Sequence, residues 1–292
     1  MSSIIGPASY SFFGFFPAFI LSLLIAAAGV GIFTYIIARR IAPLVRAAPD
    51  HRGNRLFSRI KQVLVIWLVQ YKQPRYRLAG IIHIVIFAGF IILSVRTLSL
   101  VFVGFVDDFV FPGFGGTFGV VYNFFKDYAA TLVLIACIAA GVRRGFFKPA
   151  RYAVPAKYGK DHTGEAIFVL AMIGMLMISE SLFEASKAAY EAAHTGHSEF
   201  IAPLSLAWIF RALLTGASDS VLQGTHIFMY FLHDIVFFVF LCFLPLGKHF
   251  HVITSIFNVF FMRLDKGKIK PVQYGLTPEE LDELESIGVK KL

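Results

Sequence analysis

Four histidines lie in one apolar stretch, "HIFMYFLHDIVFFVFLCFLPLGKHFH" (226–251), and imidazole is a ligand that iron accepts readily. An α-helix turns 100° per residue, so His226 and His233, seven residues apart, would lie about 20° apart around the axis. His233 and His251 are eighteen residues apart, which is five whole turns. The spacing therefore predicts three imidazoles on one helix face, with His249 on the opposite face.

A further imidazole, His83, lies inside the apolar stretch "RLAGIIHIVIFAGFIILSVRTL". If this stretch starts at the membrane surface where the stretch carrying His251 ends, the two side chains lie at matching depth on different helices. Two neutral imidazoles that approach a planar cofactor from opposite faces are the arrangement that a bis-histidine haem needs. The sequence thus predicts one haem b ligated by His83 and His251. A second haem is possible. His233 is a further candidate ligand, and His226 a cofactor or quinone contact.

Ionisable groups inside a membrane are expensive and mark functional sites by default, which favours these roles over that of ordinary core histidines. The other five histidines are expected to be solvated loop or interface residues: His51, His162, His194, His197 and His249.

The composition indicates a membrane protein, because 57% of the 292 residues are apolar and only 15% are charged. Runs of about 18 or more apolar residues predict membrane-spanning helices. Five such runs occur, at about 12–38, 78–105, 118–142, 164–188 and 222–247. The first has no basic leader and no evident cleavage site, so it is expected to remain as a span. The predicted fold is an all-α integral membrane protein with five transmembrane helices.

The net charge of +9 is concentrated in two loops. Residues 39–77 hold ten Lys or Arg against one acid, and residues 143–161 hold six against one. The positive-inside rule then predicts an N-terminus outside and a C-terminus in the cytoplasm, in a multi-pass protein of the cytoplasmic membrane. Because this charge pattern is explained by topology, no nucleic-acid partner is expected.

Two shorter apolar segments, 55–71 and 200–214, are expected to lie flat as interfacial helices on the cytoplasmic and outer faces. The predicted haem domain covers residues 1–262, and residues 263–292 form a cytoplasmic tail. In that tail Thr277, Pro278 and Glu280 are typical of a helix start. Cys137 and Cys242 are the two cysteines of the sequence, too few for a disulfide framework or a Cys-ligated iron–sulfur cluster.

The segment "LHDIVFFVFLCFLPLGKHFHVITSIFNVFF" resembles the haem b membrane subunit, gamma, of respiratory nitrate reductase. The segment "AGIIHIVIFAGFIILSVRTL" looks even more like the membrane domain of heterodisulfide-reductase-type iron–sulfur oxidoreductases, including those that collect electrons from electron-transfer flavoprotein. The resemblance covers about residues 10–262 and implies a haem between His83 and His251. It departs at Leu93, where the nitrate reductase subunit has a second histidine for an outer haem. An outer haem on His233 or His226, another ligand, or a quinone pocket there remain open alternatives.

Charged residues in the predicted outer half of the bundle are candidates for quinone chemistry. Glu180 and Glu184 have the right depth for proton exchange with a quinone, or belong to a solvated helix end. Arg96 is a candidate partner for a haem propionate, or extends to the headgroups. Lys126 and Asp127 are expected to pair with each other.

The expected function is a membrane cytochrome b-type electron-transfer subunit between a cytoplasmic iron–sulfur or flavin partner and the quinone pool. The resemblance implies an iron–sulfur module that is missing or on a separate polypeptide, with electron-transfer flavoprotein as a possible donor. Two rival functions are a transporter or proton channel with a histidine relay, and a haem-less membrane anchor for a redox partner. Whether such a subunit counts as an enzyme is left open by the sequence.

Overall fold

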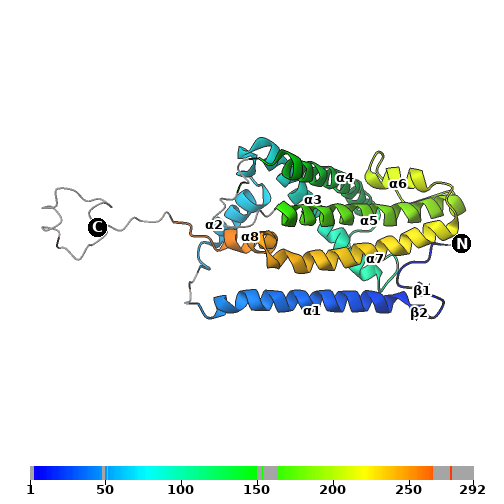
Figure 1. Cartoon of the computed structure of the whole chain (residues 1–292), viewed down its shortest axis with the longest axis horizontal. Helices are drawn as coiled ribbons and strands as arrows, with labels where there is room; N and C mark the ends of the chain where they lie inside the picture. The colour runs from blue at the N-terminus through cyan, green and yellow to red at the C-terminus, as the bar shows by residue number, and fades with distance from the viewer. Residues whose placement is uncertain are drawn as a thin grey trace.

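Five long apolar helices run side by side through the bundle (Figure 1). The computed structural model describes residues 3–47, 50, 52–149, 153, 163–265 and 277. The long helices are α1 (Ala18–Val45), α3 (Arg77–Val103), α4 (Gly116–Val142), α5 (Thr163–Thr195) and α7 (Asp219–Phe243). A π-helical turn, η3 (Arg143–Phe147), continues α4, and a 3₁₀ turn, η6 (Leu244–Leu246), continues α7.

Each of these helices is long and apolar enough to cross a bilayer, which confirms the five predicted spans and makes the chain a multi-pass membrane protein. Two bounds differ from the prediction. The first helix begins at Ala18 rather than near residue 12, because Ser11–Phe12 (β1) and Phe16–Pro17 (β2) pair as two short antiparallel strands. The fourth continues to Thr195, so its last two turns extend past the predicted end.

Helix α5 lies at the centre of the bundle and packs against α7, α4 and α6, whereas α1 packs mainly against α7. Of the most apolar window of α5, 56% is buried, against 11% for α1. A membrane helix needs no buried face to be stable, since lipid tails are as apolar as the protein interior. The exposed side of α1 is therefore expected to face hydrocarbon.

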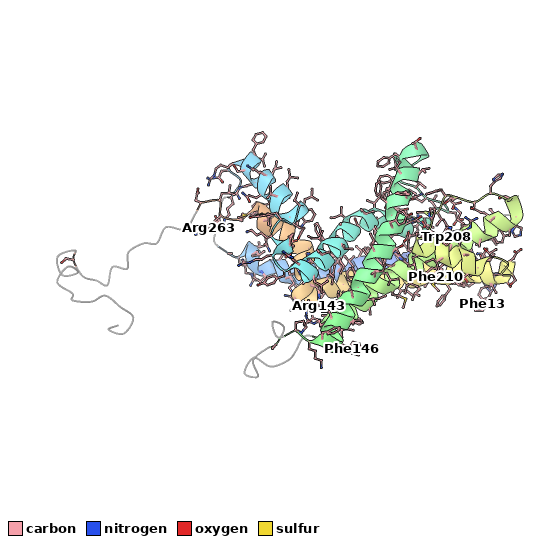
Figure 2. All side chains as sticks on the ribbon, turned by 90° about the horizontal axis from the view of Figure 1, so that it is seen from above. Phe13, Arg143, Phe146, Trp208, Phe210 and Arg263 are labelled. Carbon is pink, nitrogen blue, oxygen red and sulfur yellow. The ribbon has the colours of Figure 1, made fainter. Side chains whose placement is uncertain are left out.

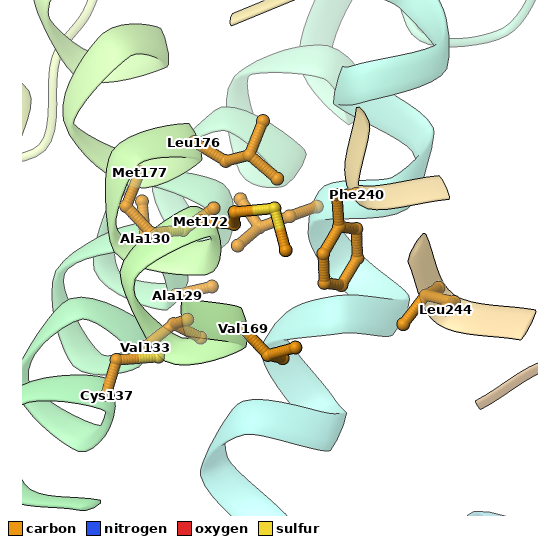
Figure 3. Close-up of a cluster of buried hydrophobic side chains, with 11 residues drawn as sticks. Ala129, Ala130, Val133, Cys137, Val169, Met172, Leu176, Met177, Phe240 and Leu244 are labelled. Carbon is orange, nitrogen blue, oxygen red and sulfur yellow. The ribbon is translucent and has the colours of Figure 1, made fainter. Parts of the chain in front are cut away.

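The main apolar core lies where α3, α4, α5 and α7 meet (Figure 3). Met172 and Leu176 of α5 lie between Val133 of α4 and Phe240 of α7 in this cluster. Small residues bring the helices together, since a Cβ added at Gly89 would lie 2.1 Å from a methyl group of Val133. Close approach at small residues is a common way for membrane helices to pack.

Short helices mark the two ends of the bundle (Figure 1). At one end, here the α8 end, lie α2 (Leu56–Gln62), η1 (Val63–Leu68), η2 (Gln73–Arg75) and α8 (His251–Phe260). At the other, the α6 end, lie α6 (Leu206–Leu214) and the two strands. Phe13 and Trp208 lie at the α6 end and Arg263 toward the α8 end (Figure 2).

The segments predicted as interfacial are helical over part of their length. The first forms α2 and the π-helical turn η1. In the second, the helix begins only after Ser205, whose hydroxyl accepts a hydrogen bond from the backbone N–H of Trp208 at 3.2 Å. Such a side-chain cap satisfies one of the free N–H groups of the first turn and sets the start of α6.

The prediction of one continuous helix from His226 to His251 is wrong. Helix α7 ends at Phe243, and Pro245 lies in the 3₁₀ turn that follows. Gly247 is extended, with φ −130° and ψ −153°, and a second 3₁₀ turn, η7 (Lys248–Phe250), precedes α8. Proline supplies no backbone N–H and clashes with the preceding turn, so the helix cannot continue through this segment unchanged. The five-turn alignment of His233 with His251 therefore does not hold.

The predicted helix start in the tail, at Pro278 and Glu280, lies outside the described residues, as do His51 and His162.

Candidate functional site

His251 is the first residue of α8, and one of its two ring nitrogens contacts a backbone carbonyl. Its Nδ1 lies 3.0 Å from the carbonyl oxygen of Lys248. A carbonyl only accepts hydrogen bonds, so in the neutral ring Nδ1 carries the proton and Nε2 has a free lone pair. A ring fixed through Nδ1 in this way is the usual state of a histidine that binds a metal through Nε2.

His83, in the second turn of α3, lies close enough to His251 for the two imidazoles to interact electrostatically. Its Nδ1 is buried and has no hydrogen-bond partner among the residues that the structure describes. A buried polar nitrogen without a partner is unfavourable, because its hydrogen bonds to water are lost without replacement. The structure thus brings these two predicted residues together at the α8 end, although α7 breaks before His251.

This pair of side chains fits the axial ligands of a haem. One ring is fixed through Nδ1 with Nε2 free, and the other has a buried Nδ1 with no hydrogen-bond partner among the described residues. Within the described residues, no group of three or more His, Cys, Asp or Glu side chains is arranged to hold a metal ion. A haem needs only two axial ligands from the protein.

Helix α8, which His251 begins, is held by α2 and η1. Arg59 is 3% exposed, and its Nη1 donates to the carbonyl oxygens of Phe260 at 2.8 Å and Met262 at 3.1 Å. Near the middle of α8, the indole N–H of Trp67 donates to the hydroxyl of Ser255 at 3.0 Å. These bonds fix both the end and the middle of α8 against the preceding helices.

An exposed ion pair lies just beyond this clamp. Arg55 donates to both carboxylate oxygens of Asp265, at 3.0 and 2.5 Å. The guanidinium holds the pKa of Asp265 below its ordinary value, chiefly through this hydrogen bond. Both groups are open to solvent, so the pair contributes little to stability.

The turn between α7 and α8 is anchored by α1 and α5. Arg40 of α1 donates to the carbonyl oxygen of Leu246 at 2.8 Å and lies 5.7 Å from the ring centre of Phe250. His249, expected to be a solvated loop or interface residue, has a side chain 14% exposed, and its Nδ1 lies 3.2 Å from a carboxylate oxygen of Glu165. Burial lowers the pKa of His249, which favours the neutral ring.

His226 and His233 both face α5, as the seven-residue spacing predicts, and both are 2% exposed. His226 donates through Nδ1 to the carbonyl of Phe183 at 3.0 Å and stacks on the Phe183 ring with centroids 4.0 Å apart. His233 Nδ1 lies 3.2 Å from the hydroxyl of Ser179. The Nε2 of His233 is buried and has no partner in the described part of the chain. Each ring is therefore positioned by α5 through one nitrogen.

A pocket of about 230 Å³ opens beside His226 at the α6 end. Its walls include Phe183, Asp107 and Asp108, together with the segment from Ser3 to Pro7. Asp107 holds that segment in place, since its carboxylate accepts from the backbone N–H groups of Ala8 at 2.8 Å and Ser9 at 3.1 Å. This pocket places polar groups and an aromatic ring around one buried imidazole.

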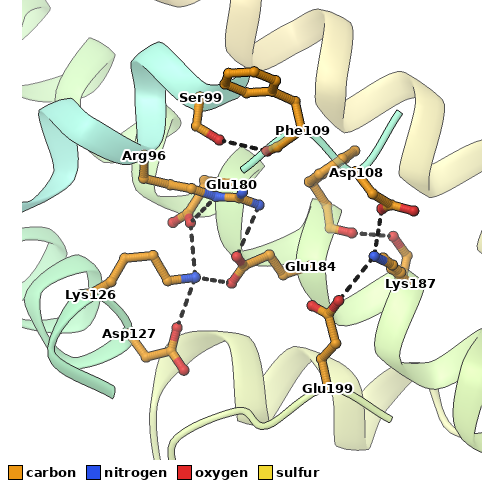
Figure 4. Close-up of polar contacts among 12 residues, drawn as sticks. Arg96, Ser99, Asp108, Phe109, Lys126, Asp127, Glu180, Glu184, Lys187 and Glu199 are labelled. Carbon is orange, nitrogen blue, oxygen red and sulfur yellow. Dashed lines mark hydrogen bonds and ion pairs between the residues drawn. The ribbon is translucent and has the colours of Figure 1, made fainter. Parts of the chain in front are cut away.

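Five charged side chains meet between α3, α4 and α5, and we call them the buried ion cluster (Figure 4). Its members are Arg96, Lys126, Asp127, Glu180 and Glu184. Lys126 Nζ contacts all three carboxylates, with Asp127 at 3.1 Å, Glu180 at 3.3 Å and Glu184 closer still. Arg96 lies 3.4 Å from Glu180 and 3.0 Å from Glu184.

The cluster corrects two of the alternatives drawn from the sequence. Glu180 and Glu184 do not belong to a solvated helix end, because the Glu180 residue is 3% exposed and its side chain 4%. Arg96 is paired with these two carboxylates rather than extended to the headgroups. The expected contact between Lys126 and Asp127 is present.

Leu93 occupies the position where the resemblance would place a second histidine of the same helix. It is 5% exposed and belongs to the main apolar core. An aliphatic side chain donates no electron pair to a metal, so this position offers no ligand for an outer haem. The imidazole Nε2 of His233 is therefore without a histidine partner at that place.

Sequence reasoning missed two buried polar positions. Arg59 was counted with the basic loop residues, although it clamps α8. Asp234, next to His233, is 2% exposed, and neither carboxylate oxygen has a hydrogen-bond partner among the described residues. Asp234 had a usable signal, since a carboxylate in a predicted membrane span is itself a candidate functional residue.

Two curated proteins are similar to this chain. The probable iron-sulfur-binding oxidoreductase FadF of Bacillus subtilis is 26% identical over 259 residues, which are 87% of this chain and 34% of that protein. The EtfAB:quinone oxidoreductase of Syntrophomonas wolfei is 22% identical over 242 residues, 83% of this chain and 32% of that protein. The chain is thus similar to oxidoreductases. It spans about a third of the length of each of these relatives.

Neither a protein-family model nor a solved structure matches the chain. The resemblance to iron–sulfur oxidoreductases agrees with these two relatives, whereas the finer likeness to the nitrate reductase gamma subunit stays a prediction.

Proposed function

We propose that this chain is a membrane cytochrome b-type electron-transfer subunit or domain, which passes electrons between an iron–sulfur or flavin partner and the quinone pool. The observation that carries this proposal is the approach of His83 and His251 at the α8 end, each with a ring nitrogen suited to a ligand. The similarity to an iron-sulfur-binding oxidoreductase and to an EtfAB:quinone oxidoreductase supports the redox role and the class of partner.

His83 and His251 would hold the haem, which would supply a one-electron carrier within the membrane. The chain's own contribution is to set the ligands. The Lys248 carbonyl fixes the His251 ring with Nε2 free, and Arg59 keeps α8 in place from the other end. His83 lies among apolar residues of α3, and its Nδ1 is buried.

The orientation follows from charge. Most of the basic residues between the long helices lie in 39–77, between α1 and α3, and in 143–161, between α4 and α5. The last turn of α1, the first turn of α3, the last turn of α4 and the first turn of α5 lie at the α8 end (Figure 1). The positive-inside rule places that end in the cytoplasm. A haem held by His83 and His251 would then lie near the cytoplasmic surface, within reach of a soluble iron–sulfur protein or electron-transfer flavoprotein.

The quinone is proposed to bind toward the opposite, outer end. The pocket beside His226 has polar groups and an aromatic ring that suit a quinone headgroup. Because His226 Nδ1 donates to the Phe183 carbonyl, its Nε2 would accept a hydrogen bond from a hydroxyl of the reduced quinone, the quinol. Glu180, Glu184 and Arg96 do not line this pocket, so their part in quinone chemistry is that of a charged network deeper in the bundle.

The transporter or proton-channel alternative is less well supported. A histidine relay along one helix would need His233 and His251 on one continuous face, and the break at 244–250 separates them. The haem-less anchor would give no role to the approach of His83 and His251 on different helices.

The visible absorption spectrum of the purified protein, reduced with dithionite, tests the proposal. A b-type haem spectrum and a fixed ratio of haem to polypeptide are expected. A colourless protein that takes up no added haem would contradict it.

A further inference from the structure

The buried ion cluster carries an imbalance of charge. Two cations, Arg96 and Lys126, face three carboxyl groups, so the fully ionised cluster would have a net charge of −1. The Lys126 and Asp127 side chains are 2% and 3% exposed, and that of Glu180 is 4% exposed. A net charge enclosed in an apolar bundle is strongly unfavourable, and buried groups then neutralise by binding a proton. One of the three carboxyl groups is therefore expected to keep its proton.

The groups around the cluster on every side do not supply the missing positive charge. The neighbouring Tyr122 is neutral, and its hydroxyl donates to the carbonyl of Ile92 at 2.9 Å. From the α6 side, the backbone N–H of Ala202 donates to Asp127 at 2.8 Å. On α7, the positive charge of Arg96 acts electrostatically on His233. The next cation on α5 is Lys187, which is engaged by three carboxylates of its own (Figure 4).

Lys187 links the cluster to solvent at the α6 end. On α5 the charged residues Glu180, Glu184, Lys187 and Glu191 follow one another at intervals of four, three and four, which places them along one helix face. Lys187 acts electrostatically on Glu184, toward the bundle interior.

In the other direction Lys187 binds carboxylates at the surface, and the exposed fractions of these side chains rise outward. Its Nζ lies 2.6 Å from Asp108, 3.2 Å from Glu199 and 3.8 Å from Glu191. The side chains of Asp108 and Glu199 are 75% and 69% exposed, against 4% for Glu180. A file of ionisable groups thus runs from water to the middle of α5.

The inner end of the file lies beside an imidazole with an unsatisfied nitrogen. Ser179, which precedes Glu180, contacts Nδ1 of His233 at 3.2 Å, and Nε2 of His233 is buried without a partner among the described residues. The unpartnered Nε2 of His233 is independent of the charge count. It places a nitrogen that can form a hydrogen bond or bind a ligand near the cluster.

We propose that the buried ion cluster binds one exchangeable proton, and that the file through Lys187 exchanges this proton with the aqueous phase at the α6 end. The proton would be used in the reduction of quinone, and this role rests on the proposed function. Reduction of one quinone consumes two electrons, from the iron–sulfur or flavin donor, and two protons. The two protons leave the cluster for the quinone oxygens by way of Lys187 and Asp108, because Asp108 lines the pocket beside His226 and lies 2.6 Å from Lys187 Nζ. The carboxylate formed in the cluster takes up the next proton from water through the file.

Infrared spectroscopy of the whole protein in lipid nanodiscs tests the proton site directly, because a protonated carboxyl group has a carbonyl band that shifts in D₂O. Glu180→Gln, Glu184→Gln and Asp127→Asn each leave two cations and two carboxylates, so each is expected to remove the same band. Asp219→Asn, at an exposed carboxylate of the α6 end, is the matched control and should keep it. Asp234 lies outside the cluster and is unchanged in all of these variants. Any carbonyl band from its side chain is therefore the same in every spectrum.

The rate of hydrogen–deuterium exchange of that band tests the file. Lys187→Met is expected to keep the band and to slow its exchange severalfold. If none of the three cluster variants removes a band, the carboxyl groups are all ionised and the proposal is wrong; unchanged exchange in Lys187→Met would overturn the file. The haem spectrum of the same samples is a separate readout: a haem without the band refutes this site alone, and the band without a haem refutes the proposed function alone.

Discussion

Arg59 Nη1 lies 2.8 Å from the carbonyl oxygen of Phe260, so that α2 holds the last turn of the helix that His251 begins. The free carbonyls at a helix end need partners, and a buried guanidinium supplies several N–H donors in a fixed geometry. Arg59 also donates to the carbonyl and side chain of Asn54, at 2.7 and 3.0 Å. One side chain therefore joins the chain before α2 to the end of α8.

Replacing Arg59 with Met is expected to loosen α8 and with it the ring of His251. Loss of hydrogen bonds from a charged, buried donor costs about 1.5–3 kcal/mol in the free energy of unfolding. Thermal unfolding in detergent, followed by the haem spectrum, measures the loss. Arg55→Met, at an exposed arginine four residues earlier, is the matched control and should change little. Equal midpoints for the two variants would show that Arg59 does not support α8.

Gly29 of α1 is expected to tolerate no side chain. A Cβ at this position would lie 2.2 Å from Cδ1 of Phe238 on α7, whereas a Cβ at Gly31 would meet nothing within 4 Å. Gly29→Ala should therefore destabilise the contact between α1 and α7 by about 1–3 kcal/mol, and Gly31→Ala should be neutral or slightly stabilising. The thermal unfolding midpoints of the two variants measure this difference in stability. The packing described for α1 would be wrong if both behaved alike.

Lys126 is expected to be essential for assembly of α3, α4 and α5. Lys126→Met would leave Arg96 facing three carboxyl groups in a buried site, and removing one partner of a buried ion pair costs about 3–5 kcal/mol. The yield of folded, monodisperse protein should fall sharply. Adding Glu184→Gln to that variant returns the fully ionised charge from −2 to −1, the value for the unaltered cluster when all its groups are ionised, and partial recovery is expected. A stable Lys126→Met protein would argue against the enclosed cluster.

His226→Phe is expected to affect quinone rather than haem. Phenylalanine can keep the ring contact with Phe183 but offers no nitrogen to the pocket. Loss of one hydrogen bond of about 1 kcal/mol, from a quinol hydroxyl to Nε2, predicts roughly fivefold weaker quinol binding, with an unchanged haem spectrum. Reduction of the oxidised protein by a soluble quinol, measured over a range of quinol concentrations, gives the change. Unaltered kinetics would place the quinone elsewhere.

The sequence predicted the membrane class and the number of spans because both depend on the length and composition of apolar runs. The pairing of histidine faces on α7 also followed from helix geometry alone, as His226 and His233 both face α5. These features are local, so the helical period is enough to derive them.

The break before His251 could not be placed from helix geometry. Pro245 signals a disturbance, but whether the chain kinks or ends its helix depends on Arg40 and Glu165, which hold the turn from α1 and α5. The buried ion cluster depends in the same way on contacts among three helices. Its residues were visible in the sequence, yet their partners were set by the packing of α3, α4 and α5.

Ligation of one iron by His83 and His251 is tested most directly by the absorption spectrum of the dithionite-reduced variants. The unaltered protein and His197→Ala, a control at an exposed histidine of the α6 end, are expected to show a low-spin b-type haem. His83→Ala and His251→Ala should each lose that low-spin signal. If both of these variants keep it, the iron has other ligands and the proposed electron carrier is assigned to the wrong residues.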